Sequence, residues 1–281
     1  MGWLEVADGI LVRRHASFDL NAGLVVGDGH CLVIDTREHL DAGQELAAAV
    51  RQVTTAPWTV VNTHAHFDHF MGNGAFLPGE IWSLDRTREI IEHYGDVQRR
   101  VMVHVAHQHE RADLAAGLEA TPLTPPNRTF PPPATALDIG GREVTLRHLG
   151  RGHTDNDIVI SVAGTSVVFA GDLVEEGAPP AFDDAYPIAW GATLEALLPL
   201  TSGPVVPGHG AVVDEAFVRE QRELHDRVAA AARDAATTVR GLPDEVATVA
   251  LTRARAELAG RLTMPRPDEV LARSGVPDDQ S

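Results

Sequence analysis

Short apolar runs bounded by glycine and proline alternate with longer stretches of helical periodicity along the chain. Runs rich in β-branched residues that end at turn-forming residues predict strands. In the first third of the chain these runs are residues 9–14, 22–26, 31–35 and 58–61. Apolar residues at helical spacing predict one helix among them, over residues 39–53.

The rest of the chain has the same alternation, with more helix toward its end. The Pro-rich residues 121–133 and 177–187 are expected to form loops, and residues 85–118 one or two helices with a break near Gly95. Further strands are predicted over residues 81–83, 143–149, 157–162, 166–170 and 205–206. Further helices are predicted over residues 191–200, 214–239 and 243–261. Two groups of strands with helices between and after them favour a mixed α/β fold, with a two-sheet core covered by helices.

Charge and composition narrow the class of protein. The formal net charge is −17, and all 23 basic residues are arginine. Because such a field repels phosphate, it argues against nucleic-acid and anionic-membrane partners and leaves a small-molecule substrate as the expected one. No apolar stretch approaches the roughly 18 to 20 residues that span a bilayer, and the first residues do not resemble a signal peptide. We therefore expect a cytoplasmic protein; its oligomeric state stays open.

A cluster of histidines follows the strand predicted at residues 58–61. The sequence His-Ala-His-Phe-Asp-His occupies residues 64–69. His64, His66 and Asp68 share a two-residue period, so an extended backbone can present them to one side. His69 breaks this period and can face elsewhere. The pattern suits two neighbouring metal ions, with His64 and His66 at one and Asp68 and His69 at the other.

Three more ligand-type residues lie just past predicted strands, each beside glycine. They are His153 in Gly-His-Thr, Asp172 in Gly-Asp-Leu and His209 in Pro-Gly-His-Gly. Glycine lets the backbone approach an ion closely. Imidazole and carboxylate ligands suit Zn²⁺, the expected ion, and also iron or manganese. No thiolate narrows this choice, because the only cysteine, Cys31, cannot build a Cys-rich site.

These motifs, in this order, resemble the metallo-β-lactamase superfamily. The resemblance implies a four-layer αββα sandwich over residues 1–213, with residues 214–281 as a helical extension packed on the same domain. It implies that a first metal ion is bound by His64, His66 and His153, and a second by Asp68, His69 and His209. Asp172 would bridge the two ions. Asp35 matches a position that could orient a ligand imidazole, although a simple turn residue explains it equally well.

The resemblance also narrows the activity. Classical β-lactamases of the family have Cys or Ser where Asp172 stands, and its di-iron oxidoreductases have Glu in place of His66. We therefore expect a dinuclear hydrolase of an ester, thioester, lactone or related carbonyl compound that acts through a metal-bridging hydroxide. The catalytic residue Asp68 would orient this hydroxide or pass its proton to the leaving group. The alternatives are a mononuclear iron sulfur dioxygenase of the same superfamily, a β-lactamase-like amide hydrolase and a non-catalytic metal-binding protein.

Other candidate residues have no assigned role at this stage. His93, His104, His107 and His109 lack carboxylates at ligand spacing, so a solvated helix face is the favoured interpretation. Tyr186 and Trp190 could line a substrate pocket or simply pack beneath a loop.

Overall fold

The computed structural model describes residues 2–264 and 266–276, and two sheets form its centre. The first sheet has seven strands in chain order: β1 (Leu4–Ala7), β2 (Ile10–Arg14), β3 (Asn21–Val26), β4 (Cys31–Ile34), β5 (Trp58–Val61), β6 (Glu80–Leu84) and β7 (Arg128–Phe130). Strands β1 to β4 pair antiparallel, and β4 to β7 pair parallel.

The second sheet has five strands in the order β12-β11-β10-β9-β8. They are β8 (Ala134–Ile139), β9 (Arg142–Arg147), β10 (Val159–Val162), β11 (Val168–Glu175) and β12 (Val205–His209). Only the β11–β12 pairing in this sheet is parallel. The carboxyl ends of β11 and β12 therefore point the same way, which matters for the site described below.

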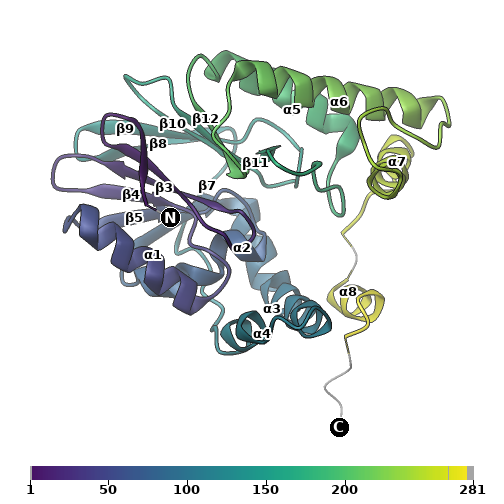
Figure 1. Ribbon diagram of the computed structural model, residues 1–281. Coiled ribbons are helices and arrows are strands. Elements are labelled where there is room, and N and C mark those ends of the chain that lie inside the picture. Colours follow the sequence, from purple (N-terminus) through teal and green to yellow (C-terminus); the bar gives the residue numbers. More distant parts are fainter. Residues whose placement is uncertain (1, 265, 277–281) are drawn as a thin grey trace, which may run out of the picture.

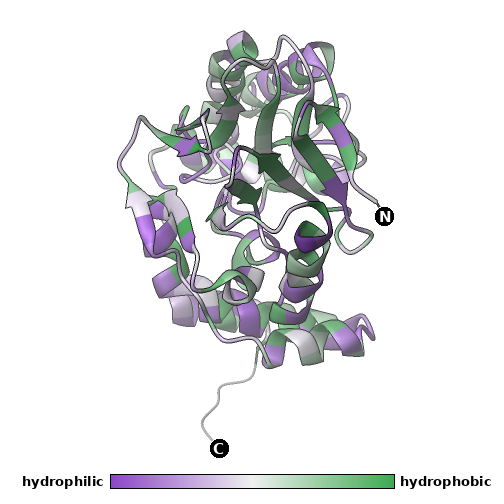
Figure 2. Ribbon diagram, turned by 90° about the vertical axis from the view of Figure 1, so that its left-hand side faces the viewer, coloured by the Kyte–Doolittle hydropathy of each residue, from purple (hydrophilic) through white to green (hydrophobic). Residues whose placement is uncertain are grey.

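Helices cover the outer face of each sheet (Figure 1). Helix α1 (Leu40–Val53) packs Leu46 and Val50 on the first sheet. Helices α5 (Pro187–Leu197) and α6 (Glu215–Arg233) lie over the second. Between the sheets lies a buried apolar layer that includes Ile34, Ile160 and Phe169, and the central strands are the most hydrophobic part of the view in Figure 2. The αββα sandwich expected from the sequence is confirmed.

Further helices stand at one end of the sandwich. Helices α3 (Asp85–Gln108) and α4 (Ala112–Glu119) follow β6, and α7 (Asp244–Leu258) and α8 (Pro267–Arg273) follow α6. Helix α8 contacts α3, so the end of the described chain returns toward the first half of the molecule (Figure 1). None of the helices in the described ranges is both long and apolar enough to cross a membrane. The domain division at residue 213 stays a prediction.

The expected break at Gly95 is wrong, because α3 runs through this residue to Gln108. A Cβ atom at Gly95 would lie 2.5 Å from Leu123 Cδ1, so this glycine allows close packing rather than ending the helix. The helix ends instead at Gln108, two residues before Glu110, whose φ of 56° is left-handed.

The extended loop expected over residues 121–133 is only partly correct, since it contains β7. Strands β1 and β8 and helix α8 were not predicted at all. Strand β11 extends five residues beyond its predicted end, and α5 begins four residues early, at Pro187. A short helix α2 (Phe67–Phe70) also interrupts the histidine cluster.

Candidate metal centre

Five segments from both sheets bring the seven candidate ligands together. His64 and His66 follow β5, Asp68 and His69 lie on α2, and His153 lies in the loop between β9 and β10. Asp172 and His209 lie within β11 and at the end of β12. Their ligand atoms form two groups, each within 4.8 Å: His64, His66, His153 and Asp172 in one, and Asp68, His69 and His209 in the other.

In the first group, imidazole nitrogens converge on one carboxylate. His153 Nε2 lies 2.8 Å from His66 Nδ1 and 3.4 Å from Asp172 Oδ2. His64 Nε2 lies 3.6 Å from the same oxygen. Three of these side chains are buried, and His66 is about one-quarter exposed, at 25%.

The second group lies beside the first and shares Asp172 with it. His209 Nε2 is 3.5 Å from Asp68 Oδ2 and 3.4 Å from His69 Nε2. Asp172 Oδ1 is 3.3 Å from His69 Nε2, and Asp172 Oδ2 is 3.1 Å from His209 Nε2. One carboxylate is therefore within reach of both groups.

Two details of the expected geometry are corrected. Asp68 does not continue an extended backbone with His64 and His66, because the chain turns into α2 at Phe67 and carries Asp68 and His69 to the second group. Asp172 lies inside β11 rather than past its end. It is accommodated there because its neighbour on β12 is Gly208, where a Cβ atom would lie 1.7 Å from Asp172 Oδ1.

Hydrogen bonds fix which ring nitrogen of several histidines faces the centre. Asp35 accepts a hydrogen bond from His69 Nδ1 at 2.8 Å, and the Phe18 carbonyl accepts one from His209 Nδ1 at 2.7 Å. Asp184 accepts one from His66 Nε2 at 2.9 Å. These bonds leave Nε2 of His69 and His209, and Nδ1 of His66, free as ligand atoms.

The residues present fit divalent metal ions. His64 Nε2 and Asp172 Oδ1 are buried with no hydrogen-bond partner, although buried polar atoms are nearly always paired. His66 Nδ1 and His153 Nε2 face each other across 2.8 Å, where a shared cation would satisfy both lone pairs. Nitrogen and carboxylate oxygen are the ligands that zinc and related ions take.

The charged and buried side chains of the centre shift one another's pKa values. Burial, reinforced by His69, holds the pKa of His64 well below its usual value. Burial acts against protonation of His209 too, but the charge of Asp172 raises the pKa of His209 to about 10. Burial opposes ionisation of Asp172, yet His209 and His69 hold the pKa of this carboxyl well below its usual range. A divalent ion would therefore bind an already ionised carboxylate and would displace protons from imidazoles.

A small cavity of about 70 Å³ opens beside the first group. Its walls include His66, Gln98 of α3, Tyr186 and Met264. Trp190, by contrast, is fully buried; its Nε1 donates to the Leu173 carbonyl at 3.1 Å, and its ring lies edge-on to His153 at 5.7 Å between centroids. Of the two aromatic candidates, only Tyr186 lines this cavity.

The polar residues of this wall that sequence reasoning missed include Gln98, Asp184 and Arg253. They come from α3, from the loop after β11 and from α7, so no spacing in the chain links them to the histidine cluster. A weak signal existed for Asp184, which is two residues from Tyr186.

The histidines of α3 do not join the centre. His93, His107 and His109 are exposed, and neither ligand group in the described residues includes them or His104. This agrees with the solvated helix face favoured by the sequence.

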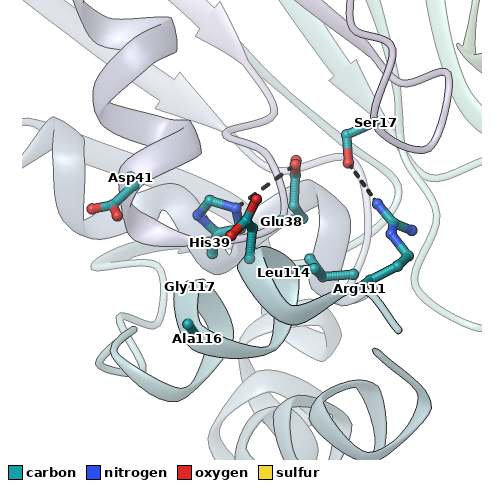
Figure 3. Close-up of a pocket in the computed structure, with 9 residues that line it drawn as sticks. Ser17, Glu38, His39, Asp41, Arg111, Leu114, Ala116 and Gly117 are labelled. Carbon is teal, nitrogen blue, oxygen red and sulfur yellow. Dashed lines mark hydrogen bonds and ion pairs between the residues drawn. The ribbon is translucent and has the colours of Figure 1, made fainter. Parts of the chain in front are cut away.

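A larger cavity of about 480 Å³ lies between α1 and α4. Figure 3 shows Glu38 turned toward His39 and Arg111 toward Ser17, whereas Asp41 points away. Arg37 donates to Glu38 at 3.1 Å, Glu38 is 4.0 Å from His39, and Arg111 donates to Ser17 at 3.4 Å. None of the seven candidate ligands is among the described residues that line it. These internal pairings give no indication of a ligand there.

Comparisons with known proteins identify the family and the fold. The family described as the metallo-beta-lactamase superfamily matches residues 18–209. The structure is similar to a metallo-beta-lactamase from Pontibacter korlensis at 18% identity and a TM-score of 0.62, over 80% of this chain and 98% of that one. It is also similar to the metallo-beta-lactamase FIM-1 from Pseudomonas aeruginosa in its mono-zinc form, at 16% identity and a TM-score of 0.60, over 80% of this chain and 94% of that one.

A third similar structure is the stereoselective inverting sec-alkylsulfatase Pisa1 from Pseudomonas sp. The identity is 17% and the TM-score 0.73, over 95% of this chain, which spans about half of the sulfatase (53%). At these identities the three structures support the fold alone. Among curated proteins, no match was found.

Proposed function

The chain belongs to the metallo-β-lactamase superfamily and is a metal-dependent hydrolase, and we propose that it uses two divalent metal ions to hydrolyse an ester, thioester, lactone or related small molecule. The observation that carries the proposal is that seven ligand-type side chains converge in two groups with Asp172 within reach of both. In the proposed assignment, His64, His66 and His153 hold one ion, Asp68, His69 and His209 hold the other, and Asp172 bridges them. Zn²⁺ is the favoured ion, with iron and manganese as alternatives.

Bound divalent ions would supply a Lewis acid for the substrate carbonyl and would lower the pKa of water to about 7, so that a nucleophile for hydrolysis would exist near neutral pH. The chain itself supplies the alignment. Asp35 and the Phe18 carbonyl hold the rings of His69 and His209 in place through Nδ1, which directs their Nε2 atoms toward the second group.

Asp68 is the proposed catalytic residue. Its carboxylate is buried on α2 within the second group, and Oδ2 lies 3.5 Å from His209 Nε2. From there it can accept a proton from the attacking water or pass one to the leaving group.

The cavity beside His66 is the proposed substrate entrance. It combines polar groups such as Gln98 with the apolar side chains of Ile90, Leu262 and Met264. Such a wall suits a small molecule with an apolar part. Because the structure is similar to an alkylsulfatase over most of its length, sulfate esters belong in the substrate panel.

Metal removal and restoration test the proposal. We expect chelator-treated protein to be inactive on a panel of esters, thioesters, lactones and sulfate esters, and about two equivalents of Zn²⁺ to restore activity. Asp172→Ala should bind fewer than two equivalents, whereas Asp8→Ala, at an exposed carboxylate paired with Arg142, should bind two. Full activity without metal would refute the hydrolase mechanism, and oxygen uptake with a persulfide would favour the dioxygenase alternative.

A further inference from the structure

The imidazole of His66 has a partner on each side. Its Nδ1 faces His153 and Asp172 in the first ligand group. Its Nε2 lies 2.9 Å from Oδ2 of Asp184, which belongs to the loop between β11 and α5. Because an ionised carboxylate can only accept, the proton of His66 must be on Nε2.

We propose that Asp184 is a positioning residue for His66, and that helix α7 holds Asp184 in place through Arg253 and Glu257. The inference rests on the proposed metal-binding role of His66. By keeping the proton on Nε2, Asp184 leaves the Nδ1 lone pair for the ion and makes it a better donor.

Arg253 binds the Asp184 loop through its backbone. Its guanidinium donates to the carbonyl oxygen of Ala185, at 3.0 Å from Nε and 2.8 Å from Nη2. A further hydrogen bond from Nη2 reaches the carbonyl oxygen of Asp184 itself. The planar guanidinium thus fixes two consecutive peptide groups, and with them the direction of the Asp184 side chain.

Glu257 binds the next part of the same segment. Its carboxylate accepts hydrogen bonds from the backbone N–H groups of Ile188 at 2.7 Å and Ala189 at 3.1 Å, in the first turn of α5. These N–H groups have no partner within the helix, so Glu257 satisfies them from outside. Arg253 and Glu257 are four residues apart on α7 and therefore lie on one helix face.

The segment between these two anchors also touches the other side of the centre. The N–H of Tyr186 donates to the carbonyl of Gly152 at 2.8 Å, and Gly152 precedes His153. The face of α7 that carries Arg253 and Glu257 therefore supports two of the three histidines of the first group. Helix α7 lies outside residues 18–209, the part of the chain that the family match covers.

Variants of the two neighbouring aspartates test the first step. We expect Asp184→Ala to weaken Zn²⁺ binding at one site by about tenfold to a hundredfold, measured by competition with a chromophoric chelator. Asp183 and Asp184 are both exposed, and the contact with His66 is made by Asp184. Asp183→Ala therefore removes the same charge without that contact and should leave both affinities unchanged. Asp184→Asn should restore part of the loss, because the amide oxygen can still accept from Nε2.

Variants of two arginines on α7 test the second step. Arg253→Gln should weaken the same site by about twofold to thirtyfold, whereas Arg255→Gln, whose arginine binds the carbonyl of Ala236 instead, should not. Glu257→Gln provides a second variant if Arg253→Gln folds poorly, and circular dichroism monitors folding for each.

The outcomes separate the two proposals. If the unaltered protein binds two ions and Asp184→Ala binds them as tightly as Asp183→Ala, the positioning role is overturned while the proposed function stands. If Asp184→Ala weakens binding but Arg253→Gln and Glu257→Gln match Arg255→Gln, the part assigned to α7 is overturned. If the unaltered protein binds no ion, the proposed function itself fails.

Discussion

Asp35 illustrates how one buried carboxylate can serve the backbone and a candidate ligand together. It is only 2% exposed, has a left-handed φ of 61°, and accepts hydrogen bonds from the N–H and Oγ1 of Thr63, each at 2.8 Å. The same Oδ2 that binds Thr63 Oγ1 also binds His69 Nδ1. Asp35 therefore ties the end of β4 to the start of the histidine cluster.

Asp35→Asn should loosen both connections. Asparagine tolerates the left-handed backbone, but its NH₂ group cannot accept, so at least one buried donor loses its acceptor. We expect a loss of about 1–3 kcal/mol in unfolding free energy and weaker binding of one metal ion. Chemical denaturation and chelator competition measure these effects. Wild-type values for both would show that Asp35 is only a turn residue.

His225 makes stability depend on pH. It is fully buried, stacks on Trp190 at 4.3 Å between ring centroids, and burial lowers its pKa to about 3. Below the unfolded pKa of about 6.5 the unfolded chain takes up a proton that the folded chain does not, so stability falls as pH falls from about 6.5 toward 3. When the pH is lowered from 7 to 5, the unfolding free energy of His225→Phe should fall by about 2 kcal/mol less than that of the unaltered protein. Urea denaturation of both proteins at several pH values checks this, and parallel pH profiles would contradict it.

At the residue scale, the ligand candidates can be recognised in the sequence, whereas the residues that surround them cannot. His64 to His69 are contiguous, and the other three ligand candidates each lie beside a glycine, which makes them visible in a single chain. Asp184 and Arg253 are common residues without local pattern, and only tertiary packing of α7 brings them to His66. Such supporting contacts have no signature in one sequence.

At the scale of elements, the close approach of β11 and β12 at the site depends on one glycine, Gly208. Gly208→Ala places a Cβ atom 1.7 Å from Asp172 Oδ1, so the carboxylate between the two ligand groups must move. We expect overpacking to cost about 1–3 kcal/mol and metal stoichiometry to fall below two. Metal analysis after dialysis, with circular dichroism to confirm folding, measures both. A variant that still binds two equivalents would show that β12 can shift without moving Asp172.

The elements that the sequence missed have physical reasons in common. Strand β8 alternates between exposed and inward positions, but only Leu137 and Ile139 of its inward residues pack on the core. This short apolar pattern is weak, and pairing with β9 makes the segment a strand. Gly95 packs against Leu123, which is 28 residues away in the chain. Because this contact is not visible in the sequence, the glycine was interpreted as a helix break. Elements with a clear buried face, such as β4, β5 and α1, were predicted to within one residue. Local pattern thus identified elements that bury an apolar face, and failed where pairing or packing decides.

At the scale of the whole molecule, the candidate centre joins the two sheets. The segment from His64 to His69 follows β5 of the first sheet, whereas Asp172 and His209 lie on β11 and β12 of the second. Ions bound there link the two sheets in the native state only, and binding to the native state alone stabilises it.

Metal removal should therefore lower the melting temperature. At a free metal concentration 100 times Kd, one site contributes about 2.7 kcal/mol, or about 5–10 °C in a chain of this size. Scanning calorimetry with and without a chelator measures the shift, and Asp172→Ala should show a smaller one. Identical melting curves would contradict a native-state metal centre.

The edge-on contact between Trp190 and His153 gives the protein a natural optical reporter. An indole this close to a bound paramagnetic ion such as Cu²⁺ loses fluorescence, whereas Zn²⁺, with its filled d shell, does not quench in this way. Replacing the other three tryptophans, Trp3, Trp58 and Trp82, by phenylalanine would leave a single emitter. With excitation selective for indole over the two tyrosines, its emission during a titration would then follow the filling of the centre without any added dye.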